Sequence, residues 1–417
     1  MHAASPTLEP KNRVASGSKG RIVAAALVIV VVAASLGFIY LSTQQTLTQQ
    51  GEEISQLTES LHSLERQIST LTQAIQNRST VYSIDLALLY SEVKDSVVVV
   101  QGVIVQRINT IFGPVLQYSE VQGSGFVCNE TGRVVIMTNF HVVDQVQNLT
   151  VTLSNGDAFD AQVLGTDVYS DIAVLEISAP IIELKPLVLA SSLDLQVGDS
   201  VIAVGTPLGL AGSMTTGIVS QLGRTIEESS TGGYSIANVI QTSVAINAGN
   251  SGGPLLNSLG EVVGVTTAII SGTQGIGLAI PSDTILRELS SLISNGTYDN
   301  HPWIGISGVD VTPDIANALN LQKTYGWLVT SVTAGGPAEK AGIRGGTKQT
   351  RISGTTLTTG GDVIIALNGT RIRNGDDLSA YLEAYTLPGE TVQVTVLRNN
   401  VEQTIPVVLG KRSSLTS

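Results

Sequence analysis

The stretch Gly249-Asn250-Ser251-Gly252-Gly253-Pro254 holds one hydroxyl in a glycine-rich turn that follows a strand-like run. Glycines let the backbone adopt positive φ and leave space beside the hydroxyl for an incoming carbonyl group. Such a turn can aim two backbone N–H groups at one point, where a tetrahedral intermediate develops negative charge. A phosphate-binding loop is one alternative, but no Lys follows the turn, as a P-loop requires. The stretch indicates a nucleophilic Ser251, with an ordinary tight turn as the remaining alternative.

Two further segments supply the base and the orienting carboxylate that a serine nucleophile needs. His141 lies where an apolar strand runs into a short apolar turn, and Asp171 stands at the head of a buried strand. Asp167 is a rival carboxylate, but it lacks the apolar run that fixes Asp171 at a strand start. The order His, Asp, Ser matches the chymotrypsin-like double β-barrel and differs from subtilisin and the α/β-hydrolases. The sequence therefore predicts a mostly-β protein with the triad His141, Asp171 and Ser251.

With these residues the chain resembles the HtrA (Deg) family of membrane-associated serine proteases, from about Ile84 to the C-terminus. Two departures are Ser243-Val244, where many members read Asp-Ala, and Phe140, where Asn is common. The resemblance implies misfolded or damaged exported proteins as substrates and a protease trimer. Further segments that resemble family patterns are Gln122-Gly123-Ser124-Gly125-Phe126, Gly205-Thr206-Pro207-Leu208-Gly209, Ala245-Ile246-Asn247 and Gly275-Ile276-Gly277-Leu278-Ala279-Ile280-Pro281.

Composition and charge exclude several classes of function. The 43 glycines, 4% aromatic residues and 42% hydrophobic residues are typical of a β-rich globular protein. A net charge of −12 disfavours nucleic acid as a partner, because nucleic acid rewards clustered Lys and Arg. The four histidines are scattered and the single cysteine is Cys128, so no metal site, cofactor or intramolecular disulfide is predicted. We expect Cys128 to be a buried small apolar residue at the end of a strand.

Residues 22–41 form an uncharged, mostly apolar run that as a helix spans about 30 Å, the thickness of a bilayer core. Basic residues flank it only on the N-terminal side, so residues 1–21 should stay in the cytoplasm and the remainder be exported. We expect a single-pass anchor in the cell membrane. The alternative is a cleavable signal peptide cut near Ala33-Ala34-Ser35, although this run is longer than the usual apolar core of ~7–15 residues.

Residues 42–80 carry apolar side chains at alternating steps of three and four, which predicts a coiled-coil stalk. An amphipathic helix lying on the membrane is the alternative, but Ser, Thr and Gln fill the polar face where Lys and Arg would be expected. Ile at most a positions with Leu at d favours two strands, whereas the family resemblance implies a trimer. We expect the trimer. The heptad residues are Ile54, Leu57, Leu61, Leu64, Ile68, Leu71 and Ile75.

The protease domain is predicted over residues 81–297, with a closing helix that has Ser282 as N-cap and ends at Asn295-Gly296. A second domain is predicted over residues 302–411. Its segment Trp303-Ile304-Gly305-Ile306 resembles the carboxylate-binding loop of a PDZ domain, with an ordinary strand as the alternative. Residues 374–385 are expected to form the helix beside the peptide groove, with Leu378 and Leu382 facing inward. The extra residues 347–360 depart from the compact PDZ pattern.

The predicted reaction is hydrolysis of internal peptide bonds without a cofactor, with the backbone N–H groups of Gly249 and Ser251 as the oxyanion hole. Ala245 and Ile246 stand where chymotrypsin-like enzymes form their specificity pocket, which predicts an apolar, shallow pocket. The second domain should bind the C-termini of peptides. Two other functions stay open: a PDZ-based chaperone with a resting protease domain, and a regulatory protease that cleaves one partner after a signal peptide docks.

Overall fold

The computed structural model describes residues 18–78, 85–110, 113–206, 212–227, 235–247, 249–267 and 275–412. These residues belong to two compact units, Met1–Ser83 and Ile84–Ser417. Most of the predicted cytoplasmic tail, and Pro207-Leu208-Gly209 of one family-like segment, lie outside the described residues. The described residues of the first unit form one continuous helix, α1 (Ser18–Arg78), which covers the predicted membrane span and the predicted stalk up to residue 78. Within it, Ala26–Thr70 contains an 18-residue window of mean hydropathy 2.3, long and apolar enough to cross a membrane.

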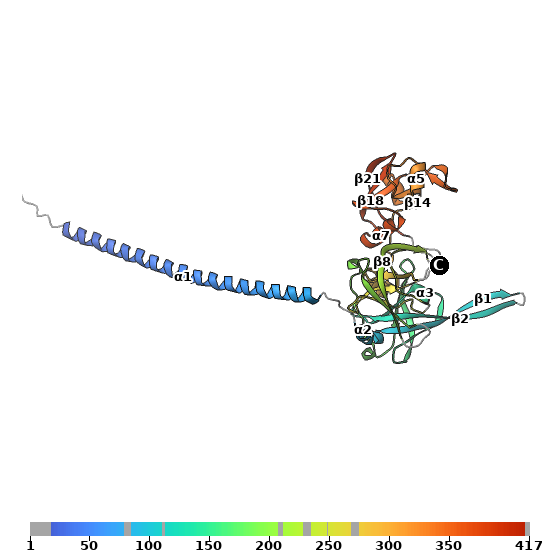
Figure 1. Ribbon diagram of the computed structural model, residues 1–417, viewed down its shortest axis with the longest axis horizontal. Coiled ribbons are helices and arrows are strands. Elements are labelled where there is room, and N and C mark those ends of the chain that lie inside the picture. The colour runs from blue at the N-terminus through green and yellow to red at the C-terminus, as the bar shows by residue number, and fades with distance from the viewer. Residues whose placement is uncertain are drawn as a thin grey trace, which may run out of the picture. The chain divides into compact units, whose positions relative to one another are not determined.

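The second unit begins with two six-stranded antiparallel barrels, which confirms the predicted double-barrel fold (Figure 1). The strand order is β1-β2-β3-β6-β5-β4 in the first barrel and β10-β11-β12-β9-β8-β7 in the second. Helix α2 (Leu86–Val93), capped by Asp85, precedes the first barrel. The first barrel comprises β1 (Val97–Thr110), β2 (Gly113–Cys128), β3 (Val135–Thr138), β4 (Val146–Thr152), β5 (Ala158–Asp167) and β6 (Ile172–Ile177), with the short α3 (Phe140–Val143) after β3. The described residues also form the 3-10 turns η1 (Lys94–Ser96), η2 (Ile181–Glu183) and η3 (Ser192–Asp194).

Helix α4 (Ser282–Asn295) follows the second barrel and ends, as predicted, at a left-handed Gly296. The predicted N-cap was wrong: Pro281 is the N-cap and Ser282 is the first helical residue. The Ser282 hydroxyl donates to the carbonyl of Ala190 instead of capping the helix. The second barrel comprises β7 (Ser200–Gly205), β8 (Ser213–Glu227), β9 (Ser235–Thr242), β10 (Pro254–Leu256), β11 (Val262–Thr266) and β12 (Gly277–Pro281).

Strands β3, β6 and β7 carry unbroken apolar runs because both of their faces are covered. On β3, Val135 and Met137 point into the core between the barrels, whereas Ile136 points into the first barrel. On β6 the same alternation places Ile172 and Val174 between the barrels. A strand buried on both faces needs no polar alternation. The ends of these strands therefore lie beside the seam between the two barrels, and that seam positions the candidate site.

The last domain is a PDZ domain built on a sheet of order β14-β15-β18-β20-β21, with β14 at one edge and β19 paired to β18. The extra residues 347–360 form the hairpin β16–β17. Helix α7 begins after an Asn374 cap, and Leu378 and Leu382 are buried, as predicted. The elements are β13 (Pro302–Trp303), β14 (Ile306–Asp310), α5 (Pro313–Ala318), β15 (Trp327–Val332), α6 (Pro337–Ala341), β16 (Lys348–Ile352), β17 (Thr355–Thr359), β18 (Val363–Leu367), β19 (Thr370–Arg371), α7 (Gly375–Tyr385), β20 (Thr391–Arg398), β21 (Val401–Val408) and β22 (Gly410–Lys411).

Candidate active site

The three predicted triad residues all lie at the ends of strands beside the seam between the barrels. His141 is on α3, three residues after β3 ends at Thr138. Asp171 directly precedes β6. This strand pairs antiparallel with β3, so that Ala173 lies opposite Thr138. Ser251 lies in the turn before β10. The antiparallel pairing of β3 with β6 brings the histidine and the aspartate together although 30 residues separate them.

The imidazole of His141 contacts the carboxylate of Asp171 closely. Nδ1 donates to Oδ2 at 2.9 Å and lies 3.0 Å from Oδ1, which also accepts the backbone N–H of His141 at 3.0 Å. The Asp171 side chain is fully buried, whereas 20% of the His141 side chain is exposed. A carboxylate on Nδ1 leaves Nε2 as the nitrogen that can accept a proton. The pair thus places the His141 imidazole at the surface, where it can act as a base, and keeps the Asp171 carboxylate away from water.

Two residues that the sequence did not single out hold Asp171 in place. The buried Thr267 donates its hydroxyl to Asp171 Oδ2, and Asn139 donates its side-chain amide to the Asp171 carbonyl at 2.9 Å. Asp171 itself has φ +53°, the left-handed conformation that Asp tolerates better than most residues. A Thr after a strand and an Asn before a helix are common, so neither carries a recognisable signal in the sequence.

Hydrogen bonds from Ser124 hold the turn that carries Ser251 in place. The Ser124 N–H donates to the Ser251 carbonyl at 2.8 Å, and the Ser124 hydroxyl donates to the Gly249 carbonyl at 2.6 Å. Gly249 and Gly252 have φ of +100° and +87°. A Cβ on Gly252 would lie 2.1 Å from the Ser124 carbonyl oxygen. Both glycines are therefore required by the backbone, as the sequence predicted for a turn that leaves space beside the hydroxyl.

The turn of Ser251 and the helix that carries His141 both pack against Gly123. A Cβ on Gly123 would lie 2.7 Å from the Val142 side chain and 3.1 Å from the Ser251 carbonyl oxygen. Val142 is the next residue after His141, so the turn of Ser251 and the helix of His141 meet here. The structure thus gathers His141, Asp171 and Ser251 in one place.

Asp167, the rival carboxylate, belongs to a different group of residues. Its carboxylate accepts the Tyr169 N–H at 2.9 Å, and Oδ2 lies 2.8 Å from Nε2 of His301. Burial lowers the pKa of the His301 imidazole, but Asp167 and Glu383 outweigh it and raise that pKa to about 10. Asp167 therefore pairs with a histidine other than His141.

The predicted pocket residues differ in exposure. Ala245 is exposed and its carbonyl accepts the Thr215 hydroxyl at 3.3 Å. Ile246 is 5% exposed and belongs to the core of the second barrel. Its side chain packs so closely on Gly277 that a Cβ there would lie 2.9 Å away. The wall beside Ala245 is thus apolar and tightly packed.

The loop Trp303-Ile304-Gly305-Ile306 joins β13 to the edge strand β14. Gly305 has φ +79° and lies under the Trp303 ring. The carbonyl groups of Ile304 and Gly305 accept backbone N–H groups from Ala338 and Thr333. A cavity of about 260 Å³ is lined by these four loop residues together with residues of α7 and of β9. This loop is held in shape by its neighbours and opens on a cavity beside an unpaired strand edge.

Comparisons with known proteins agree with this geometry. A trypsin-like peptidase domain matches residues 123–265, and a PDZ domain matches residues 302–409. Protease Do-like 1, chloroplastic, of Arabidopsis thaliana is 38% identical over 77% of this chain and 70% of its own length. HhoA of Synechocystis sp. is 39% identical over 71% of this chain and 72% of its own length. A DegP-like protein of Brucella suis is 41% identical, and the chain spans about half its length (52%).

Solved structures give the same result. The HtrA-type protease AlgW with decapeptide aligns at a TM-score of 0.58 and 27% identity, covering 79% of this chain and 99% of that chain. AlgW with tripeptide aligns at a TM-score of 0.59 and 29% identity, covering 79% and 98%. The barrels, the serine turn, the PDZ domain and the two relatives matched over most of their length lead to one assignment. The chain belongs to the HtrA (Deg) family of serine-type endopeptidases and carries one PDZ domain.

Proposed function

We propose that this endopeptidase is anchored in the cell membrane and cleaves misfolded or damaged exported proteins through His141, Asp171 and Ser251. Ser251 attacks the scissile carbonyl, and His141 takes the serine proton and later gives it to the leaving amine. Asp171 orients the imidazole and stabilises its cation. The observation that carries the proposal is the contact of Nδ1 of His141 with the buried Asp171 at 2.9 Å.

The backbone N–H groups of Gly249 and Ser251 are proposed to bind the oxyanion. Support comes from the positive φ of Gly249 and from the bonds that Ser124 makes to the carbonyl groups on both sides of the turn. Loss of one oxyanion donor typically costs about 3–4 kcal/mol of transition-state stabilisation. Ser124 is thus proposed to be a positioning residue for the oxyanion hole.

Anchoring is proposed from α1, whose N-terminal part is apolar over a membrane-spanning length. The basic residues before it favour a cytoplasmic N-terminus and an extracytoplasmic protease domain. The PDZ domain is proposed to bind free C-termini of peptides, because β14 is a sheet edge and the loop before it offers backbone N–H groups.

A regulatory protease for one specific partner is the second candidate. It is favoured by the cavity at the PDZ loop, which Thr225, Ser235 and Ala237 of the protease domain also line. A peptide that enters this cavity would contact both domains.

One experiment separates these functions. The purified chain is incubated with unfolded and with native protein substrates. Each incubation is done with and without peptides that end in apolar residues. The Ser251→Ala variant is the control. Cleavage of the unfolded substrates without a peptide is expected. Cleavage only with the peptide would favour the regulatory protease, and equal cleavage by Ser251→Ala would overturn the serine-protease mechanism.

A further inference from the structure

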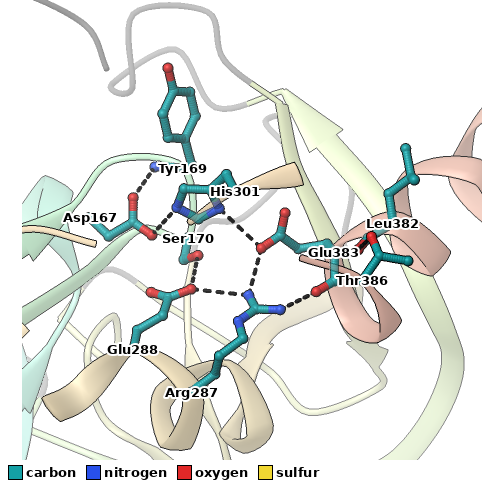
Figure 2. Close-up of polar contacts among 9 residues, drawn as sticks. All are labelled: Asp167, Tyr169, Ser170, Arg287, Glu288, His301, Leu382, Glu383 and Thr386. Atoms are coloured by element: carbon teal, nitrogen blue, oxygen red, sulfur yellow. Dashed lines mark hydrogen bonds and ion pairs between the residues drawn. The ribbon is translucent and has the colours of Figure 1, made fainter. Parts of the chain in front are cut away.

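The group of residues around His301 lies outside the catalytic site and is almost completely buried. Asp167 at the end of β5, Glu288 on α4 and His301 before β13 are 3%, 0% and 2% exposed. One ligand atom from each can be chosen so that all lie within 4.8 Å of one another. Figure 2 shows the three side chains turned toward one another beneath Tyr169. These residues come from β5, from α4 and from the segment that leads into the PDZ domain.

Each of the three side chains uses one polar atom for positioning and turns the other toward the remaining two side chains. Asp167 Oδ1 accepts the Tyr169 N–H, and Glu288 Oε1 accepts the Ser170 hydroxyl at 2.8 Å. His301 Nδ1 donates to Glu383 Oε1 at 3.0 Å. The remaining atoms are Asp167 Oδ2, Glu288 Oε2 and His301 Nε2: Oδ2 and Nε2 form an ion pair at 2.8 Å, and Glu288 Oε2 has no hydrogen-bond partner among the described residues.

We propose that Asp167 Oδ2, Glu288 Oε2 and His301 Nε2 bind one divalent transition-metal ion, with Zn²⁺ as the best match. One imidazole nitrogen and two carboxylate oxygens form a donor set that Zn²⁺ accepts, whereas Mg²⁺ and Ca²⁺ prefer oxygen alone. Buried polar atoms without partners are costly, and two buried carboxylates need positive charge close by. In the metal-free chain the imidazolium of His301 and the Arg287 guanidinium supply this charge; a divalent ion that displaces the Nε2 proton would supply it instead and would give Glu288 Oε2 a partner.

The surroundings of His301 match those of a metal-binding histidine. Such a histidine usually donates its second N–H to a carboxylate, which fixes the tautomer and the orientation of the ring. Glu383 on α7 takes this role at Nδ1. Arg287 in turn donates to Glu383 and to Glu288, so its charge offsets the outer carboxylate (Figure 2). Glu383, which is itself held by Arg287, therefore orients the His301 ring so that Nε2 faces Asp167 and Glu288, as a metal-binding histidine requires.

Space for a fourth ligand lies next to Asp167 and His301. A cavity of about 170 Å³ is lined by Asp167 and His301, and also by Tyr169, Tyr298 and Arg412. Because a bound water occupies about 30 Å³, this cavity can supply a water to complete a tetrahedral site and a path for the ion. The ion would join the end of β5, helix α4 and the segment that leads into β13. Ser251 chemistry needs no metal, so the proposed site is structural and independent of the proposed function.

The test measures metal binding by the full-length chain in detergent, in a Ser251→Ala background that prevents self-cleavage. The protein is stripped with a chelator, and Zn²⁺ is then titrated by calorimetry, with the bound metal counted by elemental analysis. We expect one Zn²⁺ per chain and a melting temperature raised by roughly 5 °C at a hundredfold excess over Kd. Bound Co²⁺ should show visible absorption bands typical of a nitrogen- and oxygen-ligated ion of low coordination number.

Matched variants locate the site. His301→Gln, Asp167→Asn and Glu288→Gln should each abolish the stoichiometric binding, and Glu383→Gln should weaken it by roughly 10- to 100-fold. His62→Gln on α1 and His141→Gln at the catalytic site should bind as the parent does. Circular dichroism checks that each variant is folded, and Glu383→Gln serves if a ligand variant is not. Unchanged binding in both His301→Gln and Glu383→Gln, or no Zn²⁺ bound by the folded parent, overturns the proposal.

Discussion

Asp171 combines a charged side chain with an unusual backbone conformation, and the two can be tested separately. Its φ of +53° suits Asp and Asn, whereas Ala in that conformation is strained by about 1–2 kcal/mol. Asp171→Asn should therefore keep the turn but lower kcat by about 10⁴, because the amide stabilises the wrong tautomer of His141. Asp171→Ala should lose the activity and also some stability.

Peptide-hydrolysis kinetics and thermal unfolding measure the two effects. Asp144→Asn, which removes a carboxylate three residues after His141, is the control and should keep the parent kcat. If Asp171→Asn cleaves as fast as Asp144→Asn, then Asp171 does not orient the catalytic base.

Thr267 is predicted to act through Asp171. Its hydroxyl donates to Asp171 Oδ2, and a hydrogen bond to a charged group contributes about 1.5–3 kcal/mol, or roughly 10- to 100-fold. Thr267→Val should lower kcat by about that factor, leave KM nearly unchanged and shift the pH profile of kcat. Thr267→Ser retains the hydroxyl and should recover most of the rate. A rate loss of equal size in both variants would mean that the methyl group, not the hydrogen bond, matters.

At this scale the sequence predicts candidate residues that lie in recognisable segments and misses those that contact them from a distance. Ser251, His141 and Asp171 stand in glycine-rich or apolar surroundings that can be identified without a structure. Thr267 is 96 residues away from Asp171, and Glu288 is 118 residues away from Ser170. Such contacts depend on how the barrels pack, which periodicity does not encode. His301 looked isolated for the same reason.

Among the elements, strands were predicted best where both faces are buried, because unbroken apolar runs such as β3 and β6 stand out. Helix ends were less certain. Gly296 closes α4 in the left-handed conformation that a glycine predicts. Ser282 was wrong as an N-cap because its hydroxyl bonds to Ala190, a tertiary contact that competes with capping. The coiled coil of residues 42–80 stays a prediction, since one chain shows α1 only as a single helix.

The loop after β9 leads to a prediction of substrate preference. Ala245 is exposed, Ile246 packs in the second barrel, and neither carries a charge that could pair with a basic side chain. We expect cleavage after small or medium aliphatic residues such as Val, Ala or Leu. Mass spectrometry of a digested unfolded protein measures the preference. A majority of cuts after Lys or Arg would refute the apolar pocket.

The edge strand β14 and helix α7 lead to a prediction of peptide binding. A free carboxylate can accept the N–H groups around Ile304-Gly305-Ile306 while the peptide adds a strand to β14. Peptides that end in an apolar residue should therefore bind more tightly than the same peptides with an amidated C-terminus. Fluorescence anisotropy with the Ser251→Ala chain compares the two forms. Equal affinities would show that the loop does not bind the carboxylate.

At the scale of the whole molecule, two sources of assembly compete. The heptad residues Ile54, Leu57, Leu61, Leu64 and Ile68 are more than half exposed on α1, so in one chain this apolar stripe has no partner among the described residues. Ile at a and Leu at d favour a two-stranded coil. Unit Ile84–Ser417 has its own cores. The resemblance to the HtrA family implies a trimer through the protease domain. The stripe and the protease domain thus point to different oligomers.

We predict that the protease domain, and not the stalk, determines the number of chains in the oligomer. The exported part should therefore be a trimer. Leu61 interrupts the Ile pattern at the a positions, and few charged residues occupy the e and g positions that fix partner number. The Ser- and Thr-rich outer face has modest helix propensity, so the stalk imposes little preference of its own. Light scattering on fragments that start at Leu47 and at Ile84 should give a trimer for both. A monomer for the shorter fragment and a dimer for the longer one would show that the stalk dictates assembly, because only the stalk distinguishes them.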